Sequence, residues 1–205
     1  MNETAEKILS TSLHLFAQKG FAATSVGDIA DEVGVVRSAL YKHFESKQAI
    51  MEGIIGRMEE KDAERAHEFG MPENSAEDAP AQYKDVSIER IRIYSRAQLE
   101  HWLVDDFSAD FRRMLIIEQY RSKEMGELFQ QYLAGGPLHY MADIFAERTG
   151  DEKNALQLAL EFYAPMFMLG SLYDGTGDLK RVEGLLDEHV TRFAKRLEEA
   201  SVRAS

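Results

Sequence analysis

The stretch of residues 24–47, TSVGDIADEVGVVRSALYKHFESK, limits the fold more than any other part of this chain. Its first half predicts a short helix, because apolar residues recur at i, i+3, i+4 and i+7: Val26, Ile29, Ala30 and Val33. Gly34 supplies a residue that can take positive φ and end that helix. A second helix is predicted over about residues 36–44. Because the small Ala30 lies four residues before Gly34, two helices can cross closely there. This is the pattern of a helix-turn-helix, whose second helix can enter a DNA major groove.

The polar face of the second predicted helix carries side chains that suit a nucleic-acid surface. At about 100° per residue, four of them share roughly 140° of arc, opposite Val36 and Leu40: Arg37, Ser38, Tyr41 and Lys42. The chain as a whole carries a net charge of −12, which excludes a protein that coats nucleic acid by bulk attraction. DNA binding must therefore come from a local basic face, and even there acidic residues offset the cations: Asp28, Asp31, Glu32 and Glu45.

Composition predicts an all-α globular protein. The 205 residues are 44% hydrophobic and 29% charged, with only four prolines, and helical periodicity covers long stretches. Cysteine is absent, which removes disulfides, thiolate metal sites and cysteine nucleophiles and fits a reducing cytoplasm. The polar amino terminus lacks a signal-peptide pattern. The most apolar window, residues 155–173, is interrupted by Gln157, Glu161 and Pro165, so we expect no membrane span.

Three domain segments are predicted, of which residues 1–47 form a helix-turn-helix domain. A first helix ends at Gly20, and its apolar stripe consists of Ala5, Ile8, Leu9, Leu13, Phe16 and Ala17. Thr24 or Ser25 is placed to cap the next helix. The small core that three such helices can close is expected to contain Leu13, Phe16, Phe21, Ile29, Val33, Leu40 and Phe44.

Residues 48–69 are predicted to form a linking helix and residues 70–205 a helical body. The linking helix turns polar beyond Glu59, as expected of a segment that leaves one core for another. Residues 70–82 contain two prolines and three acidic residues, which predicts a solvated loop. Further helices are predicted over residues 87–105, 109–122, 125–133, 138–149, 152–173 and 179–201, with a break or kink at residues 135–137.

The last two predicted helices indicate a homodimer. The first is apolar nearly all round, and the second carries a stripe close to a heptad seam. One chain of this length does not offer enough surface to cover two such apolar helices. We therefore expect them to pack against the same helices of a second copy in a four-helix interface. Its predicted residues are Leu160, Tyr163, Phe167, Leu186, Val190, Phe193 and Leu197.

Residues 20–50 resemble the amino-terminal DNA-binding signature of TetR-family transcriptional regulators over about 30 contiguous residues. The matching residues are Gly20, Phe21, Thr24, Ser25, Ile29, Ala30, Gly34, Val35, Leu40, Tyr41, His43, Phe44 and Lys47. The rest of the chain agrees with that family in plan only. The resemblance implies a three-helix head, a linking helix, and a variable all-α body that dimerises through its last two helices and often holds a small effector.

The resemblance also implies a role for each matched or aligned position. Backbone phosphate would be contacted by Thr24 and Ser25 at a helix start, and by Tyr41, His43 and Lys47. Base edges would be reached by Arg37, Ser38 and Lys42, and Arg37 could pair bidentately with guanine.

Two departures from the family pattern concern sequence readout. Val36 stands where the family usually has Ser or Thr, so the second helix of the motif loses a cap worth about 1 kcal/mol. Gly27 occupies a position that sometimes supplies a base contact in the family, and it has no side chain to do so.

An effector site would combine apolar walls with a few polar anchors. Candidates amid the apolar stretches of the body are His101, Trp102, Glu118, Tyr120, Arg121, Tyr132 and His139. No metal site or cofactor is predicted, since none of the six histidines forms an i, i+4 pair and no HExxH occurs.

The predicted function is a homodimeric, sequence-specific DNA-binding regulator that is not an enzyme. It would bind a palindromic operator with its two heads about 34–36 Å apart, and a small-molecule effector would release it as a repressor. One alternative is an activator or architectural factor without an inducer. Another is a helical enzyme or ligand-binding module with a vestigial head, but no nucleophile–base pair with recognisable spacing supports it.

Overall fold

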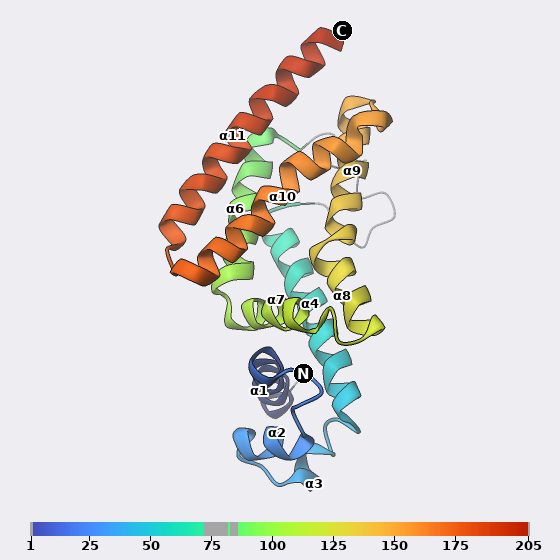
Figure 1. Cartoon of the computed structure of the whole chain (residues 1–205), viewed down its shortest axis with the longest axis vertical. Coiled ribbons are helices and arrows are strands. Elements are labelled where there is room, and N and C mark those ends of the chain that lie inside the picture. The colour runs from blue at the N-terminus through green and yellow to red at the C-terminus, as the bar shows by residue number, and fades with distance from the viewer. Residues whose placement is uncertain (1, 72–81, 83–85, 205) are drawn as a thin grey trace. The chain divides into compact units, whose positions relative to one another are not determined.

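A computed structural model describes residues 2–71, 82 and 86–204 of the chain (Figure 1). The described residues form helices and turns and include no strand, so the predicted all-α fold class is confirmed. In chain order the helices are α1 (Glu3–Lys19), α2 (Val26–Val33), α3 (Arg37–Leu40), α4 (Lys47–Glu68), α6 (Ile88–Val104), α7 (Asp106–Glu118), α8 (Lys123–Leu133), α9 (Gly135–Thr149), α10 (Glu152–Thr176) and α11 (Leu179–Ala204). Of the loop predicted at residues 70–82, residues 72–81 lie outside the described part.

The helices group into two compact units. The head unit contains Met1–Asp62 and Asp105–Phe129, and the body unit contains Ala63–Val104 and Gln130–Ser205. Within the head unit, α7 packs against α1, although the sequence assigned residues 105–129 to the body. Sequence periodicity shows that α7 has an apolar face but not which helix covers it. The boundaries at residues 47 and 69 stay a prediction.

The turns of the head unit follow from caps that can be read in the sequence. Ser25 caps α2, because its Oγ accepts a hydrogen bond from the backbone N–H of Asp28 at 3.1 Å. Gly34 ends α2 in the left-handed region, with φ 82° and ψ 35°, and its N–H donates to the carbonyl of Ala30 at 3.0 Å. Ala30 is only 1% exposed, as expected of the small residue at a close helix crossing.

The third helix is shorter than predicted. Its α-helical part covers only Arg37–Leu40, whereas the pattern predicted about residues 36–44. Beyond Leu40 the chain continues in tight turns with i→i+3 backbone hydrogen bonds. The backbone N–H of Lys42 donates to the carbonyl of Ala39 at 3.2 Å, and the backbone N–H of His43 donates to that of Leu40 at 2.9 Å. Val36, the N-cap residue, makes no side-chain cap bond, so the helix start lacks the usual support.

Most of the predicted head core is buried. The fully buried members are Leu13, Phe16, Ile29, Val33 and Leu40. Phe21 and Phe44 are only half-buried, contrary to the prediction. Phe21, in the loop between α1 and α2, packs edge-on against Phe16 with ring centroids 5.0 Å apart, at the edge of the core.

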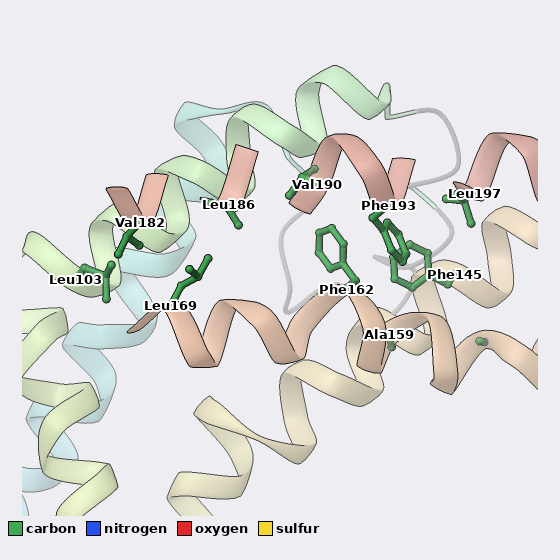
Figure 2. Packing of buried hydrophobic residues seen from close by; sticks show 11 residues of the cluster. Leu103, Phe145, Ala159, Phe162, Leu169, Val182, Leu186, Val190, Phe193 and Leu197 are labelled. Atoms are coloured by element: carbon green, nitrogen blue, oxygen red, sulfur yellow. The ribbon is translucent and has the colours of Figure 1, made fainter. Parts of the chain in front are cut away.

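In the body unit, α10 packs against α9, α11 and α6. Figure 2 shows the resulting core, in which the rings of Phe145, Phe162 and Phe193 lie 5.1–5.7 Å from one another. The other buried members of this cluster are Leu103, Ala155, Ala159, Leu169, Val182, Leu186, Val190 and Leu197. Aromatic packing thus joins α9, α10 and α11.

This core corrects the predicted dimer interface. Four of its residues in α11 pack inside their own protomer: Leu186, Val190, Phe193 and Leu197. Tyr163 is half-buried and donates its hydroxyl to the carbonyl of Leu133 at 3.1 Å, and burial raises the pKa of this phenol to about 12. The apolar stripe of α11 was correctly recognised, but its partner is α10 of the same chain.

An exposed apolar face remains on α10. Leu160 is 46% exposed, Phe167 44% and Met168 67%, and Leu156 on the same side is 50% exposed. By length and composition, α10 is also the single helix of the described part that could cross a membrane. The core helix of a soluble protein meets the same criteria, and here one side of α10 lies in the aromatic core.

Candidate nucleic-acid interface

The end of the head that carries α2 and α3 presents most of the predicted DNA contacts to solvent. The exposed ones are Ser25, Arg37, Ser38, Tyr41 and Lys42, and His43 is half-buried. Tyr41 keeps 49% of its surface exposed although it is a large aromatic side chain. Thr24 and Lys47, the remaining two, point elsewhere.

Lys47 is bound inside the head. Its Nζ donates to the carbonyl oxygens of Phe21 at 2.5 Å and Thr24 at 2.8 Å, and lies 4.4 Å from the centroid of the Phe21 ring. Burial lowers the pKa of Lys47, and the nearby carboxylate of Glu118 partly opposes that shift. The ammonium group therefore fixes the loop between α1 and α2, and the structure does not support its predicted phosphate contact.

Thr24 is also turned inward. It is 1% exposed, and its Oγ1 donates to the carbonyl of Gly20 at 2.9 Å. Its hydroxyl closes the same loop that Lys47 holds, so a phosphate contact by this side chain is not supported either. The resemblance matched both positions correctly but could not distinguish a phosphate ligand from a loop-closing residue.

Ser25 is exposed, but its hydroxyl already has an acidic partner. Asp28 Oδ2 accepts hydrogen bonds from the Ser25 backbone N–H and from Ser25 Oγ, both at 2.7 Å. These two bonds hold the pKa of Asp28 below its ordinary value. A carboxylate thus occupies the first turn of α2, where it complements the helix dipole and competes with any phosphate.

A second lysine is used internally at the other end of α2. Lys7 of α1 donates from Nζ to the carbonyl of Val33 at 2.9 Å, at a helix end where carbonyls lack helical partners. Lys7 and Lys47 therefore both bind backbone carbonyls inside the head. Within residues 24–47, the cations left exposed to solvent are Arg37 and Lys42.

Arg37 lies across α2. A Cβ built on Gly27 would fall 2.1 Å from Arg37 Nη2 and 2.8 Å from its Cζ. The guanidinium therefore occupies the space that a side chain at position 27 would fill. The sequence showed that Gly27 lacks a side chain, but only the structure shows what takes its place.

The predicted effector residues do not form one set. Glu118, Tyr120 and Arg121 belong to the head unit. Glu118 is 2% exposed, and its Oε1 accepts hydrogen bonds from the backbone N–H of Phe21 at 3.2 Å and from Arg121 Nη1 at 2.8 Å. Tyr120 is 89% exposed. These three predictions are not supported, because Glu118 and Arg121 serve the loop between α1 and α2 and Tyr120 projects into solvent.

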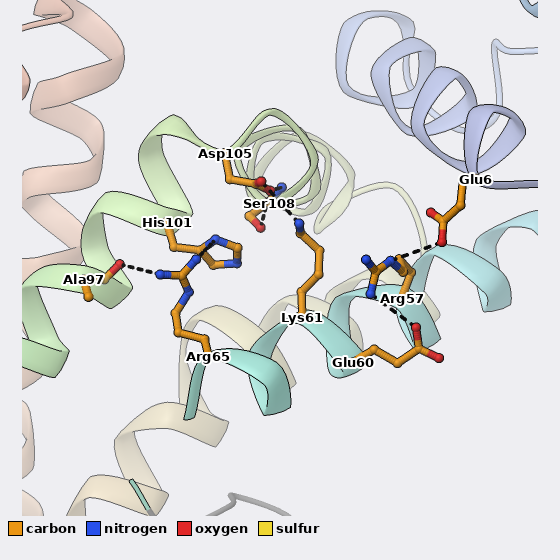
Figure 3. A network of polar contacts seen from close by, with 9 residues as sticks. All are labelled: Glu6, Arg57, Glu60, Lys61, Arg65, Ala97, His101, Asp105 and Ser108. Atoms are coloured by element: carbon orange, nitrogen blue, oxygen red, sulfur yellow. Dashed lines mark hydrogen bonds and ion pairs between the residues drawn. The ribbon is translucent and has the colours of Figure 1, made fainter. Parts of the chain in front are cut away.

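The other four candidates lie in the body unit: His101, Trp102, Tyr132 and His139. His101 is 5% exposed, and its Nδ1 lies 2.7 Å from Arg65 Nη2, while Arg65 Nη1 donates to the carbonyl of Ala97 at 3.4 Å (Figure 3). His139 is exposed and its Nδ1 hydrogen-bonds the carbonyl of Gly135 at 2.7 Å. Arg65, which is absent from the predicted effector residues, is therefore a polar neighbour of buried His101.

Polar contacts also join α4 to the loop before α7 within the head unit. Figure 3 shows Lys61 Nζ at 3.2 Å from Asp105 Oδ2, while Asp105 Oδ1 accepts from the backbone N–H of Ser108 at 3.0 Å as the N-cap of α7. Although burial acts to raise it, the pKa of Asp105 is lowered overall, by its hydrogen bonds from Ser108 and by Lys61.

Comparison with known proteins settles what kind of domain this is. Residues 8–54 match the family model described as bacterial regulatory proteins, tetR family. The amino-terminal domain belongs to the TetR family. The match covers most of α1, all of α2 and α3, and the start of α4. These elements contain the helix-turn-helix and Lys47, which binds the loop between α1 and α2.

Proteins similar in sequence to part of this chain are named as transcriptional regulators. The uncharacterized HTH-type transcriptional regulator YerO of Bacillus subtilis is 53% identical over 51 residues, which is 25% of this chain and 18% of that protein. The HTH-type transcriptional repressor KstR2 of Rhodococcus jostii is 41% identical over 49 residues, 24% of each protein. The sequence matches thus span about a quarter of this chain and about a fifth to a quarter of these relatives.

Solved structures match the fold of nearly the whole chain. A TerR/AcrR-family regulator from Aquifex aeolicus superimposes with a TM-score of 0.68 at 18% identity, over 92% of this chain and 98% of that one. The SmeT–triclosan complex gives a TM-score of 0.66 at 16% identity, over 92% and 90%. At these identities the likeness establishes the fold, including the body that the sequence matches leave out.

Replacing the two lysines of the TetR domain should separate their roles. Lys47→Ala removes two charge-assisted hydrogen bonds to carbonyl oxygens, so we expect a loss of about 1–3 kcal/mol of unfolding free energy. Lys42→Ala removes an exposed side chain and should change stability by less than about 0.5 kcal/mol. Urea denaturation of both variants at pH 7 measures the difference, and equal stabilities would contradict the internal role of Lys47.

Proposed function

We propose that this chain is a sequence-specific DNA-binding transcriptional regulator that acts as a homodimeric repressor and is released by a small-molecule effector. The observation that carries the proposal is the helix-turn-helix of α2, Gly34 and α3, with Arg37, Ser38, Tyr41 and Lys42 exposed on one end of the head. The tetR family model, which matches residues 8–54, also covers this segment.

In the proposed complex, α3 enters the major groove. Arg37 and Ser38, the first two residues of α3, and Lys42 after its end would reach base edges. Tyr41 and His43 would contact phosphates and set the register of the head on the duplex. Thr24 and Lys47 would stabilise this surface indirectly, by fixing the loop between α1 and α2. Thr24 Oγ1 donates to the carbonyl of Gly20, and Lys47 Nζ donates to the carbonyls of Phe21 and Thr24.

The net charge of the chain requires that attraction to DNA come from a few cations close to the duplex. The net charge of −12 repels DNA at long range, while few cations face outward from residues 24–47. One such head would bind weakly. Two heads held by a dimer at a spacing of about 34–36 Å would act together on a palindromic site, because the second contact then becomes intramolecular.

The exposed apolar face of α10 supports a homodimer. Leu156, Leu160, Phe167 and Met168 share one side of the helix, and Leu185 of α11 is 40% exposed. Apolar groups of this size gain free energy when a second copy covers them, at about 25 cal/mol per Å² buried. We propose this face as the dimer interface, in place of the α11 seam that fills the core of the protomer.

Repression and release by an effector draw on the relatives. KstR2 is named a transcriptional repressor, and SmeT, which has the same fold, has a solved structure titled as a complex with triclosan. An effector that binds the body would favour a dimer whose heads no longer match the operator. Each 1 kcal/mol of preference for that state weakens DNA binding about fivefold.

Selection from a randomised double-stranded DNA library tests DNA recognition. We expect the wild type to enrich a palindrome, and Tyr41→Ala to weaken binding about fivefold to the enriched and to altered sites alike, since it removes a phosphate contact. Tyr120→Ala, which deletes the 89%-exposed tyrosine after α7, is the matched control and should change nothing. Failure of the wild type to enrich any sequence would overturn the proposed function.

Charge placed on the α10 face tests the dimer. We expect the wild type to run as a dimer at micromolar concentration, and the Leu160→Glu, Met168→Glu double variant to run as a folded monomer, because burying carboxylates at an apolar interface is costly. Lys195→Glu at an exposed position of α11 is the control. Light scattering after gel filtration measures the mass. A wild-type monomer, or a double variant that stays dimeric, would contradict this interface.

A further inference from the structure

Gly27 lies in the first turn of α2, buried beneath the side chain of Arg37. A Cβ at this position would meet three atoms of the same group: Arg37 Nη2 at 2.1 Å, Cζ at 2.8 Å and Nε at 3.0 Å. Contacts this short do not occur between real side chains. The Arg37 guanidinium can therefore occupy this place only because residue 27 is glycine.

We propose that Gly27 is a specificity-determining position that acts through Arg37. The missing side chain leaves space against α2 for the Arg37 guanidinium, which is held there in position to read a base. This inference rests on the proposed function and adds to it a residue that touches no base itself. Gly27 is a positioning residue, and Arg37 is the contact.

The chemistry of the guanidinium identifies what it would read. Its planar fork of N–H donors matches the O6 and N7 acceptors of guanine in the major groove, which a lysine or a serine cannot contact in the same bidentate way. Such a contact is specific only when the fork is held at one angle. Packing against the α2 backbone at Gly27 limits the orientations of an otherwise exposed and flexible side chain.

A substitution at Gly27 should move the guanidinium and leave the fold intact. The three atoms nearest to such a Cβ all belong to the far end of the flexible Arg37 side chain. Alanine also favours a helix more than glycine does. Gly27→Ala is thus expected to melt at or above the temperature of the wild type.

The test is a double-mutant cycle on DNA selected by the wild type. Gly27→Ala, Arg37→Ala and the double variant are compared for affinity to the selected site and to the same site with each guanine replaced in turn. The matched control is Gly56→Ala in α4, where an added Cβ meets nothing within 4 Å. Melting curves of all five proteins accompany the binding curves.

We expect Arg37→Ala to weaken binding to the selected site roughly tenfold and to abolish the preference for one guanine in each half-site. Gly27→Ala should weaken binding to the same guanine-containing site, and the double variant should bind no more weakly than Arg37→Ala alone. Gly56→Ala should match the wild type.

Two results would overturn the inference while the proposed function stands. Either Gly27→Ala binds and selects DNA as the wild type does, or its effect persists in full when Arg37 is already alanine. A wild type that selects no sequence would instead overturn the proposed function itself, so the two failures are distinguishable.

Discussion

The ammonium group of Lys47 fixes the loop that supports the proposed DNA-binding surface. By binding the carbonyls of Phe21 and Thr24 it fixes the loop that joins α1 to α2. Glu118 binds the N–H of Phe21 in that same loop, so a cation and a buried carboxylate secure neighbouring backbone groups. Ser25 follows directly and caps α2. The angle at which α2 leaves the loop sets where Gly34 turns the chain and where α3 presents Arg37.

This arrangement commits two lysines to internal hydrogen bonds in a chain whose acidic residues outnumber its basic ones. Lys7 binds a carbonyl at the end of α2 and Lys47 one at its start, so both ends of the helix are tied to lysines from neighbouring helices. The outward cations left in residues 24–47 are few, and Asp28 lies beside one of them. A head of this kind gains more from placing a guanidinium accurately than from adding charge. The proposed positioning of Arg37 by Gly27 and the proposed dimer with two heads would both serve that end.

The sequence predicted what depends on local pattern and missed what depends on partners distant in the chain. The Ser25 cap, the Gly34 turn and the buried Ala30 were all visible as residue types at fixed spacing. The roles of Lys47 and Glu118 could not be predicted in this way, because their contacts join residues that are distant in the chain. Lys47 binds a carbonyl 23 positions away, and Glu118 binds an N–H 97 positions away. The stripe of α11 was seen but given the wrong partner, since an apolar face does not state which surface covers it. Leu160 and Phe167, which the sequence places in the dimer interface, are exposed on α10, and their place in an interface stays a proposal.

The salt dependence of specific DNA binding tests the central claim most directly, because it counts the cations that replace counterions on the duplex. If Arg37 and Lys42, the outward cations of residues 24–47, are the ones that meet DNA in each head, a dimer should give a plot of log affinity against log salt concentration with a slope between about −2 and −4. Measured on the palindrome selected by the wild type, that result would support a local grip reinforced by pairing. A slope steeper than about −8, the sign of broad attraction to phosphate, or no specific binding at any salt concentration, would contradict it.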